Sequence, residues 1–113
     1  MSHRVIDASV AIKWVVDERH TEEAVKLLDP SHPIHAPELL HIEIDNYFAR
    51  QVKSGKLLEN ETNAHRRLIR TAPLQIHSYA PNADSAFEIS SLLRHSIYDC
   101  VYLALAVSID GQM

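Results

Sequence analysis

Three short apolar segments alternate with longer helical stretches along this chain of 113 residues, and that alternation constrains the fold most. Residues 5–6, 33–36 and 74–77 have the length and composition of buried strands, and Asp7 follows the first of them directly. Apolar residues at helical spacing cover residues 9–16, 21–28, 37–53, 57–70, 83–94 and 96 to about 111. Strands separated by helices predict parallel pairing with helices on both sheet faces. We therefore expect an α/β fold, a three-layer α/β/α sandwich with a short parallel sheet.

The last helical stretch, which begins at Ser96, is apolar on nearly all sides. Such a helix is expected to lie against a sheet. No strand-like segment follows it before Met113. We therefore expect a single domain over residues 1–113 that is incomplete at its C-terminal end and lacks one or more strands.

The composition limits the class of protein. No apolar run reaches the roughly 18 residues that a membrane span requires. The single cysteine, Cys100, cannot form an internal disulfide, which agrees with a reducing, cytoplasmic environment. A net charge of -4 argues against a strongly basic nucleic-acid surface, but it does not exclude a nuclease with clustered acids.

Three acidic residues stand in apolar surroundings far apart in the chain: Asp7, Glu43 and Asp99. An ionised carboxylate is costly to bury unless a positive group meets it. If folding brings the three together, the expected counter-charge is a hard divalent cation with oxygen ligands. This arrangement points to phosphate-ester chemistry.

Each acid also has a purely structural interpretation, and the local sequence leaves both open. Asp7 is a capable N-cap for the helix that follows it. Glu43 can form an ion pair with Arg50 in the same helix, or it can be exposed at its rim. Asp99 lies three residues after Ser96, which is the spacing of a capping box.

The helix over residues 37–53 places Glu43 on the flank of an apolar stripe, beside Asn46 and Arg50. These two residues are therefore candidate supporting residues of the site. Asp45 falls on the opposite side, and we expect it to be solvated.

The densest basic group is Arg66, Arg67 and Arg70. Phosphate contacts are possible for these arginines, but a solvated helix face explains them better. In that arrangement Leu68 and Ile69 would face the core.

Taken together and in order, residues 5–10, 37–46 and 97–106 resemble PIN-domain nucleases. The resemblance is closest to the small toxin ribonucleases of VapBC-type toxin–antitoxin pairs. It implies RNA cleavage that depends on Mg²⁺ or Mn²⁺, with Asp7, Glu43 and Asp99 at the first three acidic positions of the family. Ser9 matches a small hydroxyl residue near the first aspartate. Asp7 and Asp99 would be the main metal ligands, and Glu43 would bind metal or orient the attacking water.

The resemblance also implies partners: an RNA substrate, a cognate antitoxin protein and a second copy of the chain in a homodimer. The family continues into a further strand that ends in a Thr/Ser-x-Asp segment and supplies another acid. An alternative function is therefore a non-catalytic, truncated PIN-like module that keeps only the dimer or partner contacts.

Overall fold

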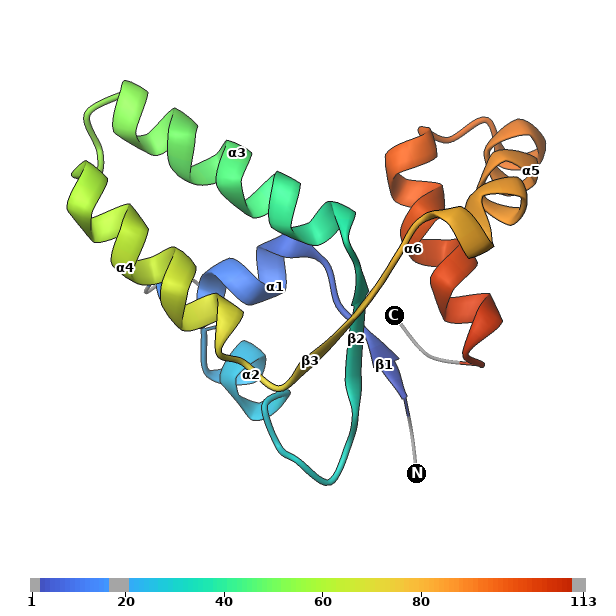
Figure 1. Cartoon of the computed structure of the whole chain (residues 1–113), viewed down its shortest axis with the longest axis horizontal. Helices are drawn as coiled ribbons and strands as arrows, with labels where there is room; N and C mark the ends of the chain where they lie inside the picture. The colour runs from blue at the N-terminus through green and yellow to red at the C-terminus, as the bar shows by residue number, and fades with distance from the viewer. Residues whose placement is uncertain (1–2, 17–20, 111–113) are drawn as a thin grey trace.

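The computed structural model describes residues 3–16 and 21–110, and a parallel sheet of three strands lies at its centre (Figure 1). The strands are β1 (Arg4–Val5), β2 (Ile34–Pro37) and β3 (Leu74–His77), in the order β1-β2-β3. In the register of the sheet, Val5 pairs with His35 and His35 pairs with Gln75. The predicted parallel pairing is confirmed.

Helices cover both faces of the sheet (Figure 1). One side carries α1 (Ala8–Lys13), α2 (Thr21–Lys26), α3 (Leu39–Lys53) and α4 (Glu59–Arg70). The other side carries α5 (Ala83–Leu93) and α6 (Ile97–Ser108), with the short 3₁₀ helix η1 (Ala80–Asn82) before α5. The three layers confirm the predicted α/β/α sandwich. Among the helices described, none has the length and apolar character to cross a membrane.

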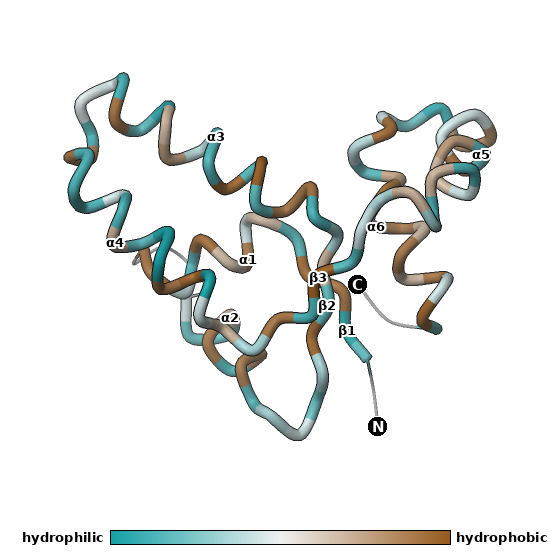
Figure 2. Tube along the Cα trace, in the orientation of Figure 1, coloured by the Kyte–Doolittle hydropathy of each residue, from teal (hydrophilic) through white to brown (hydrophobic). Residues whose placement is uncertain are grey.

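The main core forms where α3 and α6 meet the strands. Leu40, Ile44 and Phe48 recur every four residues on α3 and are at most 2% exposed. From the other layer, α6 adds Tyr102 and Leu105 to the same cluster. Figure 2 shows hydrophobic residues on the strands and, alternating with hydrophilic ones, along α3 and α6. Burial of a large apolar side chain stabilises the fold by about 1.5–3 kcal/mol, so this cluster fixes where both helices lie.

The start of α3 differs from the prediction. Pro37 was expected to begin the helix, but it is the last residue of β2, and α3 begins at Leu39. A proline restricts the residue before it to extended backbone, which keeps Ala36 in the strand. The amide of Glu38 donates to the carbonyl of His77 (2.8 Å), so pairing with β3 continues past the proline.

The predicted end of α3 at Ser54-Gly55 is confirmed. Gly55 has a φ of 77°, a left-handed conformation that glycine adopts without strain, and it reverses the chain into α4. The reversal brings α4 beside α3 (Figure 1). Nε and Nη2 of Arg66 there donate to the two carboxylate oxygens of Asp45, at 2.6 Å and 3.0 Å. Asp45 and Arg66 were expected on solvated faces, and both side chains do stay partly exposed, but they also pair with each other because the flank of α3 that bears Asp45 faces α4.

Of the two positions of α4 predicted to face the core, one is buried and the other is exposed. Ile69 is 2% exposed, whereas Leu68 is 60% exposed. Adjacent residues on a helix point about 100° apart, so a narrow contact with the core can bury only one of them.

Three histidines form a hydrogen-bonded ladder across the sheet. His3 precedes β1, His35 lies in β2 and His77 ends β3. His3 Nδ1 lies 2.9 Å from His35 Nε2, and His35 Nδ1 lies 2.9 Å from His77 Nε2. His35 is buried, and this burial, with the charges that His77 and His3 can carry, lowers the pKa of His35. The ladder satisfies a buried polar side chain at the centre of the sheet.

Candidate functional site

Asp7 lies at the junction of β1 and α1, where it is the N-cap of α1. Its Oδ1 accepts the amide N–H of Val10 (3.2 Å) and the hydroxyl of Ser9 (2.6 Å). The capping interpretation is therefore confirmed. Because both bonds use Oδ1, the other oxygen, Oδ2, takes part in neither and can bind another group. Asp7 can thus act as a cap and as a site residue at once.

Glu43 lies in α3, about one turn after the helix begins, and is partly buried. Its Oε1 accepts a hydrogen bond from the phenol of Tyr102 on α6. Arg50, with which Glu43 was expected to form an ion pair in the purely structural interpretation, is an exposed residue further along α3. The carboxylate of Glu43 is therefore held from another layer of the fold.

Asp99 lies in the first turn of α6 and is exposed. Its backbone N–H donates to the Ser96 hydroxyl (3.3 Å), so the predicted capping role of Ser96 is confirmed. That bond uses the amide of Asp99 and leaves its carboxylate available. A negative charge at this position is favoured by the positive end of the helix dipole.

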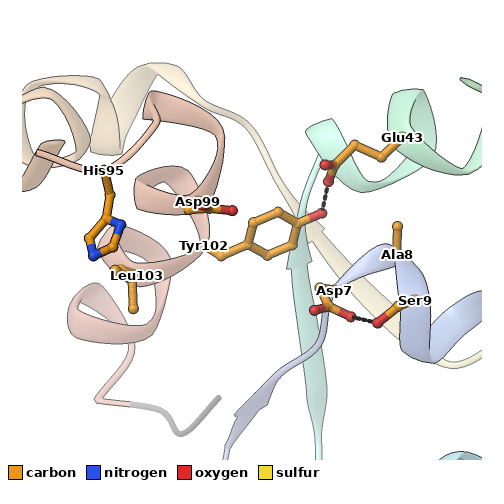
Figure 3. A pocket seen from close by; sticks show the side chains of 8 residues that line it. All are labelled: Asp7, Ala8, Ser9, Glu43, His95, Asp99, Tyr102 and Leu103. Atoms are coloured by element: carbon orange, nitrogen blue, oxygen red, sulfur yellow. Dashed lines mark hydrogen bonds between the residues drawn. The ribbon is translucent and has the colours of Figure 1, made fainter.

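One cavity, with a volume of about 410 Å³, brings the three acids together. It lies beyond the end of β1, at the edge of the sheet where parallel α/β folds place their ligands. Figure 3 shows the Tyr102 ring reaching from α6 toward Glu43, and Ser9 joined to Asp7. The residues that line the cavity come from the β1–α1 junction, α3, α6 and the turn before α6: Asp7, Ala8, Ser9, Glu43, His95, Asp99, Tyr102 and Leu103.

The phenol of Tyr102 is the buried hydroxyl that faces the acids of this cavity. Burial raises its pKa, and so do the hydrogen bond to Glu43 and the negative charges of Glu43 and Asp7. The phenol therefore stays protonated and acts as a hydrogen-bond donor. Its contact with Glu43 leaves the carboxylate as the acceptor.

The amino-acid sequence matches the PIN domain family over residues 4–112. The chain belongs to the PIN-domain family. It is 31% identical over 113 residues to Ribonuclease VapC3 of Pyrobaculum aerophilum, and the comparison covers 96% of this chain and 85% of that protein. The resemblance that the three acidic segments predicted is thereby confirmed.

The donor atoms of this PIN-domain cavity suit a hard divalent cation, although the acids are not packed around one point. Within residues 3–16 and 21–110, no three His, Cys, Asp or Glu side chains are grouped closely enough to hold one ion together. Mg²⁺, however, keeps several waters and is usually bound through one or two carboxylates. Asp7 and Asp99, with oxygen atoms facing a roomy cavity, fit that mode of binding.

Two residues that line the PIN-domain cavity, Tyr102 and His95, were not among the predicted site residues. Tyr102 lies one turn after Asp99 on the same helix, and that spacing was the available signal. His95 directly precedes Ser96, the cap of α6, and nothing in its sequence context marked it.

Asn46 and Arg50 lie on α3 with Glu43 and are exposed. Neither lines the cavity, whereas Ser9 does. Their supporting roles stay predictions.

Proposed function

We propose that this PIN-domain protein is a divalent-metal-dependent endoribonuclease and the toxin of a type II toxin–antitoxin pair. The observation that carries the proposal is that Asp7, Glu43 and Asp99, from three distant segments, line one cavity. The name of the similar protein, Ribonuclease VapC3, supports RNA as the substrate. The reaction is the hydrolysis of a phosphodiester bond.

The residues of the cavity would have different roles in binding the metal ion and orienting the attacking water. Asp7, through Oδ2, and the exposed Asp99 would hold a Mg²⁺ or Mn²⁺ ion directly or through water. The Ser9 hydroxyl and the Val10 amide fix Asp7 by its other oxygen. Glu43 would bind metal or orient the attacking water with the part of its carboxylate that Tyr102 leaves free.

A bound divalent cation supplies positive charge that stabilises the phosphate oxygens and makes the attacking water easier to deprotonate. The protein supplies the negative charge that attracts the ion and the rigid elements that fix its ligands. Asp7 is fixed by a helix cap, and Asp99 by the first turn of α6.

The test is cleavage of single-stranded RNA by the purified protein with Mg²⁺ or Mn²⁺, and with a chelator. We expect cleavage that the chelator abolishes. Asp99→Asn should lower the rate at least about 100-fold, as expected when an essential ligand loses its charge. The matched control is Asp84→Asn, which changes an exposed acid in the first turn of α5 and should leave the rate unchanged.

Metal-dependent cleavage that survives both Asp7→Ala and Asp99→Asn would refute the assignment of these acids. A folded protein that binds no divalent ion and cleaves no RNA would favour the alternative, a non-catalytic PIN-like interaction module. Circular dichroism of each variant separates loss of the site from loss of the fold.

The proposed partners are a cognate antitoxin and a second copy of the chain in the cytoplasm. An apolar groove of about 270 Å³ lies beside α3 and the start of α6, and it supports the homodimer. Two of its residues, Ile42 and Tyr98, are more than 60% exposed, and exposed apolar side chains that adjoin in one groove are typical of interaction sites. A monomeric mass at micromolar concentration in analytical ultracentrifugation would contradict the homodimer.

A further inference from the structure

We propose that Tyr102 is a positioning residue of the candidate active site and that its hydroxyl fixes the orientation in which the Glu43 carboxylate acts. The inference rests on the proposed function and deepens it. Tyr102 touches neither the scissile phosphate nor the ion in this role, because it acts through Glu43.

The position of Tyr102 on α6 links the two sides of the cavity. It lies three residues after Asp99, so both side chains project from the same face of the helix and both line the cavity. Its phenol donates to Glu43 on α3, in the layer on the other side of the sheet (Figures 1 and 3). The bond joins residues 59 positions apart in the chain.

The two partners differ in burial, and the difference assigns their roles. Tyr102 is 5% exposed and belongs to the main hydrophobic core, so packing fixes its ring. Glu43 is only partly buried and has three rotatable side-chain bonds. A fixed donor therefore selects one orientation of a flexible acid, rather than the reverse.

The hydrogen bond leaves Glu43 able to act. A carboxylate has about four lone-pair positions on its two oxygens, and the phenol occupies one of them on Oε1. Oε2 remains to bind metal or water. Residues that orient a metal ligand in this way typically change metal affinity or activity by about 10–100-fold when they are replaced.

The test compares Tyr102→Phe with Ser108→Ala. Tyr102→Phe keeps the ring in the core and removes only the hydroxyl. Ser108→Ala removes a hydroxyl from the same helix, at an exposed residue whose hydroxyl donates to the Leu105 carbonyl and which lines neither the cavity nor the apolar groove. Mn²⁺ affinity is measured by isothermal titration calorimetry. We expect Tyr102→Phe to weaken Mn²⁺ binding by about tenfold and Ser108→Ala to leave it unchanged.

RNA cleavage by Glu43→Gln and by the double variant with Tyr102→Phe gives a second readout. If Tyr102 acts through Glu43, the double variant should cleave RNA within about twofold of Glu43→Gln alone. Effects that multiply would show that Tyr102 acts independently, and the positioning role would be wrong.

The outcomes separate this inference from the proposed function. If the native protein binds Mn²⁺ and cleaves RNA, but Tyr102→Phe does both equally well, only the role of Tyr102 is refuted. Equal weakening in Tyr102→Phe and Ser108→Ala also refutes it, because the effect would not depend on Glu43. If the native protein neither binds Mn²⁺ nor cleaves RNA, the proposed function is wrong and the role of Tyr102 is wrong with it.

Discussion

Asp7 serves as a helix cap and as a proposed metal ligand, and two substitutions should separate these roles. Asp7→Asn keeps an Oδ1 that can accept from the Val10 amide and the Ser9 hydroxyl, but it replaces Oδ2 with an NH₂ group that cannot bind a cation. Asp7→Ala removes both functions. Both variants should lose metal-dependent RNA cleavage, whereas only Asp7→Ala should lose the cap.

The stability difference follows from the capping geometry. Replacing an aspartate N-cap by alanine costs about 0.5–2 kcal/mol, and asparagine caps about as well as aspartate. Losing the charge at the helix start costs about 0.3–1 kcal/mol. Relief of repulsion from Glu43 and Asp99 opposes that loss in the absence of metal. We therefore expect Asp7→Asn to lie within about 0.5 kcal/mol of the native protein and Asp7→Ala about 1 kcal/mol below it.

The assay is urea unfolding in a chelator and again with excess Mg²⁺. For an m-value near about 2 kcal/mol/M, the loss in Asp7→Ala corresponds to a midpoint shift of about 0.5 M. Mg²⁺ at about 100 times its dissociation constant should stabilise the native protein by about 2.7 kcal/mol and neither variant. Asp7→Asn as unstable as Asp7→Ala would refute the capping argument, and full stabilisation of Asp7→Asn by Mg²⁺ would refute the ligand argument.

Three further outcomes are expected. Burial and the two neighbouring imidazoles lower the pKa of His35 in the folded protein, so the unfolded chain binds the extra proton first as the pH falls below 6.5. The free energy of unfolding should therefore decrease with falling pH in this range. Chemical denaturation of His35→Gln should show a smaller decrease, and a variant with the same pH dependence as the native protein would contradict this role of His35. A double-mutant cycle on Asp45 and Arg66, both half-exposed, should give a coupling of no more than about 1 kcal/mol that shrinks in high salt, and a salt-independent value would contradict the surface character of the pair. Phe48→Ala should lower the free energy of unfolding by about 3–5 kcal/mol because Phe48 is 1% exposed. Leu68→Ala should change it by no more than about 0.5 kcal/mol, because Leu68 is 60% exposed. Thermal unfolding tests both variants, and similar losses would refute the burial argument.

The elements of this fold could be predicted because their signals are local. Residues 74–77 alternate as a strand does, and Leu40, Ile44 and Phe48 recur at helical spacing, so both elements were predicted close to their observed bounds. The three acids could be selected because each stands in an apolar segment. Their convergence on one cavity depends on the parallel order of the strands, which the alternation of elements also predicts.

The residues that were missed depend on contacts between distant elements. Tyr102 stands in a nearly all-apolar helix, where a tyrosine is typical of the core, and its partner Glu43 is 59 positions away. A helical wheel for α3 alone places Asp45 toward solvent, because it contains no information about where α4 and Arg66 lie. The error at Pro37 had a local cause, because proline suits a helix start as well as the end of an extended strand. The pairing of β2 with β3 decides between the two.

The three imidazoles that cross the sheet have a property that none of them has alone. A neutral imidazole carries one proton and one lone pair, so in the uncharged ladder both bonds must run in the same direction. If the outer nitrogen of His3 presents a lone pair, the outer nitrogen of His77 presents an N–H, and reversing the direction exchanges the two. A group that forms a hydrogen bond with the outer nitrogen of His3 or His77 would therefore fix the tautomer of the histidine at the other end of the ladder, and no strand would have to move.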